Sequence, residues 1–266
     1  MAGSSLENLI LVTREPGGIA HVTINRPAAL NSLTRAMMAD MARAFKSLDG
    51  DDPVKVIVLS GSGRSFCSGV DLTTAEEVFK GDVKDLEADP VAQMELCRKP
   101  IIGAIAGFAV TGGFEIALAC DVLVAAKGAK FIDTHVRFGI FPSWGLSQKL
   151  SRIIGANRAR EVSLTSMPVT AEQAEKWGLV NYVVEGSELL KKAREVAEAI
   201  MKNNQDLVLR YKSIINDGLK LDLGHALTLE KERGHEYYNG MTKEQFKKMQ
   251  EFLAARRSSS KPSAKL

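Results

Sequence analysis

The sequence predicts an α/β fold with a helical appendage at its C-terminal end. Two observations lead to this prediction: apolar runs of strand length alternate with helical patterns in the first part of the chain, and from about residue 187 only helical patterns follow. The 266 residues are 45% hydrophobic and 25% charged, which is enough for one large core. No apolar run approaches the roughly 20 residues of a membrane span, so we expect a globular protein without one.

Strands are predicted where short apolar runs either alternate with polar residues or continue unbroken. Six runs qualify: Leu9–Thr13, Ile19–Ile24, Val54–Leu59, Ile101–Ile105, Asp121–Ala125 and Leu179–Val184.

The first helix is predicted over Leu33–Leu48, with Ser32 as its N-cap. Within it Met37, Met38 and Met41 recur at helical spacing, a stripe that packs into a core more often than it lines a ligand. Four further helices are predicted near the C-terminal end: Ser187–Asn203, Gln205–Gly218, Gly224–Tyr238 and Thr242–Arg256.

Charge and cysteine content exclude several classes of protein. The net charge of +3 comes from 35 basic and 32 acidic residues spread along the chain, so no nucleic-acid-binding surface is expected. Cys67, Cys97 and Cys120 are too few and too irregularly spaced for a disulfide framework or a zinc site. Nothing near the N-terminus resembles a signal peptide, and we expect a reducing compartment.

A glycine- and serine-rich turn follows the predicted strand Val54–Leu59 and runs from Gly61 to Asp71. It lacks the Gly-Lys-Ser/Thr ending of a P-loop, and Phe66 replaces the third glycine of the dinucleotide-binding fingerprint. Its backbone N–H groups could still face a ligand. Taken alone, the segment fits an ordinary surface turn.

The second turn follows Ile101–Ile105, and its glycines Gly112 and Gly113 directly precede a predicted helix, Phe114–Ala119. The unpaired N–H groups of that helix would face an anion in front of Gly112. Glu115 lies in the first turn of the helix, either as a catalytic carboxylate or as a favourable partner of the helix dipole. The spacing leaves both interpretations open.

Four stretches, taken together, resemble the enoyl-CoA hydratase/isomerase family, also called the crotonase family. They run from His21 to Leu33, from Phe66 to Leu72, from Ala106 to Asp121 and from Ala171 to Val180. They occur in the family's order, and the similarity covers nearly the whole chain.

The resemblance implies a crotonase-like ββα spiral core with a C-terminal helical trimerisation region, in homotrimers that often pair into hexamers. We expect the core over residues 1–200, the helical region over 201–257 and a flexible tail over 258–266. The resemblance further implies an oxyanion hole formed by the N–H groups of Val70 and Gly112. Positions that shape the CoA and pantetheine site are Ala28, Ala29, Leu30, Ser68, Asp71 and Leu72.

One family position is altered. Hydratases of this family use two glutamates, one matching Glu115, and anchoring the second on Gly139 and Pro142 places His135 at that position. An imidazole can deliver a proton near neutral pH, but His135 could equally order a water molecule while Asp133 or Thr134 holds its ring. The proton that the α-carbon gains could thus come from His135 or from the spent Glu115.

The residues therefore predict an enoyl-CoA hydratase that adds water to a trans-2-enoyl-CoA in fatty-acid β-oxidation or related acyl-CoA metabolism. Isomerisation is less favoured, because isomerases of the family rely on the second acidic position, which is missing. Other enolate chemistry and a non-catalytic acyl-CoA-binding protein remain alternatives. No cofactor or metal is predicted beyond the CoA of the substrate.

Two further features concern substrate and location. Phe138, Phe141 and Trp144 indicate an apolar wall near the acyl chain, although spacing does not give their direction. The final residues Ala264-Lys265-Leu266 are close to the Ser-Lys-Leu signal read by the peroxisomal import receptor, so we expect a peroxisomal protein.

Overall fold

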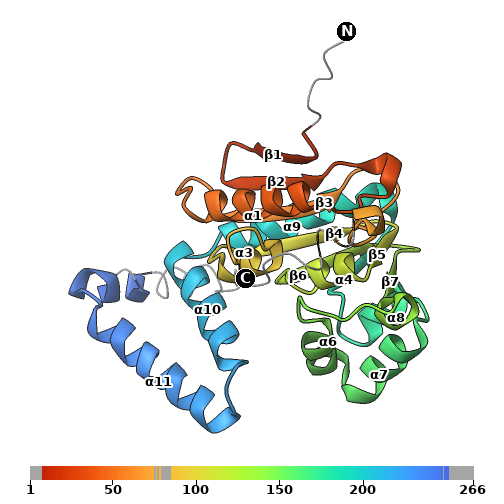
Figure 1. Cartoon of the computed structure of the whole chain (residues 1–266). Helices are drawn as coiled ribbons and strands as arrows, with labels where there is room; N and C mark the ends of the chain where they lie inside the picture. Colours follow the sequence, from red (N-terminus) through yellow and green to blue (C-terminus); the bar gives the residue numbers. More distant parts are fainter. Residues whose placement is uncertain (1–7, 75, 77, 79–84, 248, 252–266) are drawn as a thin grey trace, which may run out of the picture. The chain divides into compact units, whose positions relative to one another are not determined.

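The computed structural model describes residues 8–74, 76, 78, 85–247 and 249–251 (Figure 1). The chain divides into two compact units, Met1–Leu209 and Arg210–Leu266. The domain boundaries drawn after residues 200 and 257 stay predictions. The predicted tail, with Ala264-Lys265-Leu266, lies outside the described residues.

The first unit is built on a six-stranded sheet in the order β1-β2-β3-β4-β6-β9 (Figure 1). Strands β1 and β2 pair antiparallel and all later neighbours pair parallel. The bounds are Ile10–Arg14 (β1), Ile19–Ile24 (β2), Val56–Gly61 (β3), Ile101–Ile105 (β4), Val122–Ala126 (β6) and Tyr182–Val184 (β9). All six predicted strands are confirmed.

Some of these strands begin later than predicted because the first apolar residues bond elsewhere. The N–H of Val54 donates to the carbonyl of Asp51 in a turn, so β3 begins only at Val56. The N–H groups of Leu179 and Val180 both donate to the carbonyl of Ala174 at a helix end, which delays β9.

A second, three-stranded sheet was not predicted. It comprises β5 (Phe108–Val110), β7 (Lys130–Ile132) and β8 (Val169–Thr170), in the order β5-β7-β8. Strands β4 and β6 are each followed by one of these short strands and then by a helix, α4 (Gly112–Ala117) or α5 (His135–Phe138). This gives the ββα repeat that the family resemblance implied.

The main sheet is buried on both faces. Along β3, Ile57 and Leu59 join the hydrophobic cluster of α1 (Arg35–Asp49), whereas Val56 and Val58 join the cluster of α9 (Leu189–Met201). The alternation follows from strand geometry, in which successive side chains point to opposite faces. Such a sheet reads as continuous apolar runs, as predicted.

The start of α1 was predicted two residues too early. Its N-cap is Thr34, whose hydroxyl accepts the N–H of Met37 at 3.3 Å. The Ser32 hydroxyl instead accepts a hydrogen bond from Arg26 Nη1 at 2.9 Å. Leu33 cannot begin the helix because its carbonyl accepts the N–H of Asp71 at 2.9 Å instead of an N–H of the helix.

The remaining elements of the first unit are mostly short. The helices are α3 (Pro90–Leu96), α6 (Leu146–Ile154), α7 (Ala156–Thr165) and α8 (Ala171–Lys176), with 3₁₀ turns η1 (Pro27–Ala29), η2 (Leu72–Thr74) and η3 (Gly186–Glu188). Helix α4 begins two residues before the predicted Phe114.

Two helices follow α9, as predicted. They are α10 (Gln205–Gly218), which begins before the unit boundary, and α11 (Leu223–Asn239). Residues 243–247 and 249–251 are also helical, and the rest of the predicted helix Thr242–Arg256 lies outside the described residues.

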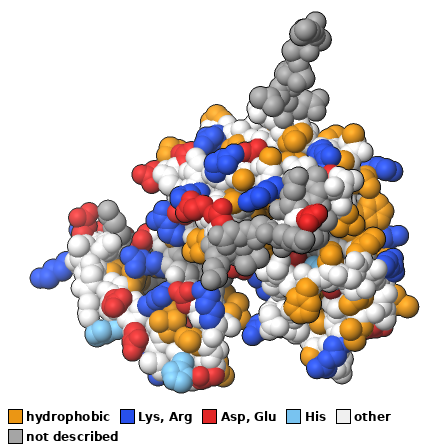
Figure 2. Space-filling view, viewed as in Figure 1, with side chains coloured by type: hydrophobic (Ala, Val, Ile, Leu, Met, Phe, Trp, Pro, Cys, Tyr) orange, Lys and Arg blue, Asp and Glu red, His pale blue; other side chains and the backbone are white. Residues whose placement is uncertain are grey.

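The described surface carries both signs of charge. On the face drawn in Figure 2, basic and acidic side chains are interspersed rather than gathered into regions of one sign. Of the helices that the structure describes, none combines the length and the apolar character needed to cross a membrane.

Candidate active site

The two glycine-bearing turns meet side by side. Cys67 forms a parallel bridge with Ala109: its N–H donates to the Phe108 carbonyl at 3.0 Å and its carbonyl accepts from Val110 at 2.9 Å. Segments about 40 residues apart in the sequence are therefore joined by main-chain hydrogen bonds next to both predicted donors.

Glycine is required where these turns touch. Gly69 has φ +92°, and a Cβ there would lie 2.9 Å from the Val110 carbonyl oxygen and 3.3 Å from the Gly112 nitrogen. A Cβ on Gly113 would lie 2.2 Å from the Cys67 carbonyl oxygen. Only residues without a side chain allow the backbones to approach this closely.

Val70 and Gly112 line a shared pocket, and their N–H groups have no acceptor in the described part of the protein. The pocket has a volume of about 940 Å³. Two main-chain donors are thus available to an oxygen atom of a bound molecule.

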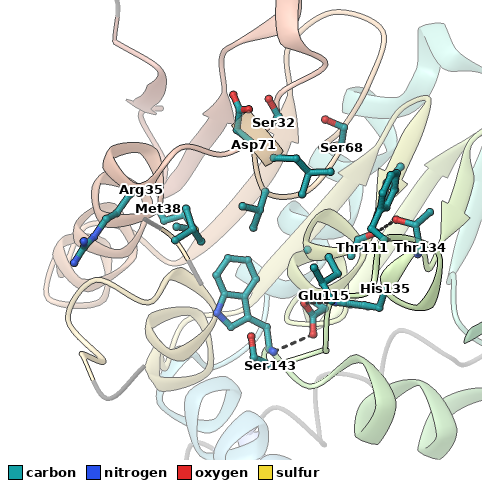
Figure 3. Close-up of a pocket in the computed structure, with 18 of the residues that line it drawn as sticks. Ser32, Arg35, Met38, Ser68, Asp71, Thr111, Glu115, Thr134, His135 and Ser143 are labelled. Carbon is teal, nitrogen blue, oxygen red and sulfur yellow. Dashed lines mark hydrogen bonds and ion pairs between the residues drawn. The ribbon is translucent and has the colours of Figure 1, made fainter. Parts of the chain in front are cut away.

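Most of the predicted site residues line this pocket (Figure 3). They are Ala29, Ser68, Val70, Asp71, Leu72, Gly112, Glu115 and His135. Ala28 and Leu30 are not among the lining residues. Leu30 instead has φ +53°, and its carbonyl accepts the N–H of Ser68, so it contributes to the shape of the turn.

Glu115 is buried, with 3% of its surface exposed, in the first turn of α4. Its Oε1 accepts hydrogen bonds from the N–H of Trp144 at 2.9 Å and of Leu146 at 3.2 Å. Burial raises the pKa of this carboxyl, and the two N–H groups and His135 oppose the rise only in part. One oxygen is thereby fixed, while Oε2 lies toward the next polar group of the pocket.

That group is His135, the first residue of α5, which is 5% exposed. Its Nε2 lies 3.7 Å from Glu115 Oε2, and its Nδ1 lies 2.7 Å from Asp133 Oδ1. The sequence left Asp133 and Thr134 as equal candidates to hold the ring, and the structure places Asp133 there. The Thr134 hydroxyl instead forms a hydrogen bond with that of Thr111 (Figure 3).

The carboxylate of Asp71 is held by hydrogen bonds from Thr73 and Arg26. It accepts from the N–H and hydroxyl of Thr73 and from Arg26 Nη1 at 2.5 Å. The hydrogen bonds from Thr73, and then the Arg26 guanidinium, lower the pKa of Asp71 to about 2. It therefore stays ionised at neutral pH and stabilises the loop that carries Val70.

One side of the pocket is apolar. Its side chains are Met38, Leu72, Val78, Phe138, Ile140, Phe141 and Trp144, so the three residues singled out in the sequence all face the pocket. Met38 also packs in the core, which shows that the core interpretation of the methionine stripe holds and that its edge reaches the pocket. A pocket with an apolar wall beside two N–H donors suits an acyl group whose carbonyl needs stabilising.

Sequence reasoning missed the donors to Glu115 and the pair Thr111–Thr134. Trp144 and Leu146 donate through main-chain N–H groups, so the identity of these residues does not reveal the contact. Thr111 has φ +50°, an unusual conformation for a β-branched residue, and no short motif predicts it. In the part of the chain that the structure describes, no three His, Cys, Asp or Glu residues gather as metal ligands would.

Comparisons with known proteins agree on one family. The family model described as Enoyl-CoA hydratase/isomerase matches residues 14–260. An Arabidopsis thaliana protein named "Probable enoyl-CoA hydratase 1, peroxisomal" is 75% identical over 260 residues, which cover 98% of each chain. The "Short-chain-enoyl-CoA hydratase" of Clostridium acetobutylicum is 36% identical, covering 95% of this chain and 97% of that one.

Solved structures with similar folds carry enoyl-CoA hydratase names as well. A structure named enoyl-CoA hydratase from Bacillus anthracis has a TM-score of 0.81 at 30% identity and covers 93% of this chain and 97% of its own. A structure of a probable enoyl-CoA hydratase/isomerase from Mycobacterium abscessus has a TM-score of 0.82 at 30% identity. The match covers 95% of this chain and 97% of that chain.

Proposed function

The chain belongs to the enoyl-CoA hydratase/isomerase family, and on that premise we propose that it adds water across the 2,3 double bond of a trans-2-enoyl-CoA to give a 3-hydroxyacyl-CoA. With the family, the predicted crotonase-like α/β fold is confirmed. The observation that carries the proposed reaction is a buried carboxylate, Glu115, in one pocket with the N–H groups of Val70 and Gly112.

The two N–H groups act on the thioester oxygen. When a nucleophile adds to C3 of the enoyl group, negative charge moves through C2 and C1 onto that oxygen. Fixed donors stabilise the charge as it forms, because they need no reorganisation during the reaction. Val70 and Gly112 thus form the oxyanion hole of the reaction.

Glu115 activates the water. Hydrogen bonds from Trp144 and Leu146 hold Oε1, which leaves Oε2 to accept a proton from a water molecule as the water oxygen attacks C3. Burial raises the pKa of this carboxyl, which makes it a better base than an ordinary glutamate while it is ionised.

His135 completes the addition by delivering a proton to C2. Anchoring the family pattern on Gly139 and Pro142 assigns His135 to the position of the second glutamate, and its Nε2 lies 3.7 Å from Glu115 Oε2, which supports this role. Because a proton lost by water and a proton gained at C2 balance each other, the reaction is redox-neutral and needs no electron carrier. The oxyanion hole polarises the carbonyl as a metal ion otherwise would, and we include no cofactor beyond the substrate's CoA.

Replacing Glu115 tests the reaction. We expect Glu115→Gln to lower kcat for crotonyl-CoA hydration by about 100- to 10,000-fold, the usual contribution of a general base. Glu172→Gln is the matched control, since Glu172 also lies in the first turn of a helix, α8, but is exposed. Near-wild-type turnover in Glu115→Gln would overturn the proposal.

A panel of acyl-CoA thioesters, followed by mass spectrometry, separates the alternatives. Gain of one water molecule identifies a hydratase, and an unchanged mass with a shifted double bond identifies an isomerase. Loss of the acyl group or of carbon dioxide indicates other enolate chemistry. Binding without any product identifies a non-catalytic acyl-CoA-binding protein.

The protein also acts in the peroxisome under our proposal. Support comes from the name of the Arabidopsis relative and from the predicted receptor signal Ala264-Lys265-Leu266. A fluorescent fusion that keeps these three residues at its C-terminus should appear in peroxisomal puncta, and deleting them should make it diffuse. Puncta that persist after the deletion would contradict a role for the signal.

A further inference from the structure

Asp133 makes more contacts with His135 than a helix cap requires. It follows β7, and only 2% of its surface is exposed. Asp133 precedes the N-cap of α5, Thr134; its Oδ1 accepts the main-chain N–H of His135 at 3.1 Å and also lies 2.7 Å from His135 Nδ1. The side chain of Ser163, on α7, adds a further hydrogen bond. The carboxylate is therefore fixed from two elements.

This contact determines which ring nitrogen faces the pocket. A carboxylate accepts hydrogen bonds but does not donate them, so the proton of the contact belongs to Nδ1 of His135. The other nitrogen, Nε2, is then directed at Glu115 Oε2, 3.7 Å away. Ring orientation and tautomer follow from one buried carboxylate.

Asp133 itself stays ionised. Burial raises the pKa of Asp133, but hydrogen bonds from His135 and Ser163 outweigh burial and hold it below the usual range. An ionised carboxylate accepts a stronger hydrogen bond from Nδ1 than a neutral group would.

We propose that Asp133 is the positioning residue that enables His135 to replace a carboxylic acid as the proton donor to C2. The inference rests on the proposed hydratase function. Asp133 itself touches no substrate and acts only through the imidazole.

Protons and electrons balance around the cycle. Glu115 takes a proton from water, the water oxygen bonds to C3, and the electron pair of the double bond moves toward the thioester oxygen. The pair returns to form a C2–H bond with the proton of His135 Nε2. The two atoms lie 3.7 Å apart, farther than a direct hydrogen bond, so the proton on Glu115 Oε2 returns to Nε2 through one water molecule, which restores both residues.

A double-mutant cycle tests the positioning role. We expect Asp133→Asn to lower kcat for crotonyl-CoA about 100-fold with little change in KM, because the ring loses the contact that orients it. In a His135→Gln background, Asp133→Asn should have no further effect. Wild-type kcat in Asp133→Asn, or a full additional loss in the His135→Gln background, would overturn the proposal.

The chain offers a closely matched control. Asp222 caps α11, accepts the N–H of His225 at 3.1 Å and contacts His225 Nδ1, but both side chains are exposed and neither lines the pocket. Asp222→Asn should leave kcat and its pH profile unchanged.

Ring ¹⁵N NMR separates this inference from the proposed reaction. In the wild type, the His135 Nδ1 should report a bound proton at every pH, and Asp133→Asn should remove that signature even if no substrate is turned over. If the protein fails to hydrate crotonyl-CoA but the signature is present, the proposed function fails and the Asp133 contact stands. If the signature is absent, the positioning role is wrong whatever the activity.

Discussion

At the scale of single residues, the site contains two buried carboxyl groups whose pKa values shift in opposite directions. Asp133 receives hydrogen bonds from a histidine ring and a serine, and its pKa falls. Glu115 receives two main-chain N–H groups, which do not offset its burial, and its pKa rises. The ionised form is therefore favoured for Asp133, whereas burial favours the protonated form for Glu115.

The raised pKa of Glu115 predicts a cost in stability. A carboxyl whose pKa is higher in the folded state binds its proton more tightly when folded, so stability is lost as pH rises through that pKa. We expect Glu115→Gln to raise Tm at pH 8 by a few degrees, because the amide has no charge to bury. The gain should shrink as pH falls toward the range of an ordinary glutamate.

Differential scanning calorimetry from pH 8 down to that range measures whether Glu115→Gln raises or lowers Tm. Glu172→Gln serves as the control, because the pKa of Glu172 is lowered rather than raised and its removal should not increase Tm. A lower Tm for Glu115→Gln at pH 8 would show that the ionised carboxylate stabilises the fold.

At the scale of elements, the strands and helices that contain long apolar runs were predicted from the sequence, whereas the shortest strands were missed. The six strands of the main sheet and α10 were found because their runs are long and apolar on one or both faces. Strands β5, β7 and β8 have two or three residues each, too few for a period to be recognised. Strand β9 also has only three residues, but it was found because the apolar run Leu179–Val184 begins before it.

The same limit applied to the site. Val70, Gly112, Glu115 and His135 could be singled out from motifs, since each lies in or near a family pattern. Trp144 and Leu146 could not be identified as donors to Glu115, because any residue but proline supplies a main-chain N–H. Contacts of that kind become visible only when the chain is folded.

Because the two turns are in close contact, we expect any side chain at position 113 to disrupt the site. Adding a Cβ there would place it 2.2 Å from the Cys67 carbonyl oxygen, so the turns must separate and the N–H of Gly112 must move. We expect Gly113→Ala to lower kcat/KM at least 100-fold and to lower Tm.

Gly186→Ala is the control for that substitution, since no atom lies within 4 Å of a Cβ at this position. It should retain wild-type kcat/KM and Tm. Full activity in Gly113→Ala would show that the contact between the turns does not set the geometry of the donors.

At the scale of the whole molecule, the second unit, Arg210–Leu266, has apolar side chains on its surface. Large exposed ones are Tyr211 and Ile215 on α10, Leu219 directly after it, and Leu223, Leu227 and Tyr238 on α11. Exposed apolar side chains in such number are typical of surfaces that are covered in an assembly. They support the predicted homotrimer or hexamer, which we propose for this protein.

Sedimentation velocity tests the assembly. The wild type should sediment at three or six times the monomer mass, and Leu223→Glu combined with Leu227→Glu should shift it toward the monomer. Leu164→Glu on α7 is the control, because that leucine is 69% exposed but lies in the first unit. A monomeric wild type would contradict the proposal.

The hydrogen bond from residue 144 to Glu115 has a consequence for how the enzyme can change. The main chain makes that bond, whereas the indole of Trp144 lines the pocket, and a Cβ on Gly112 would lie 3.3 Å from its ring. The hydrogen bond to Glu115 therefore does not depend on the side chain at 144, provided that the residue is not proline. We expect a library of non-proline residues at position 144 to change the preferred acyl chain while the catalytic base keeps this hydrogen bond.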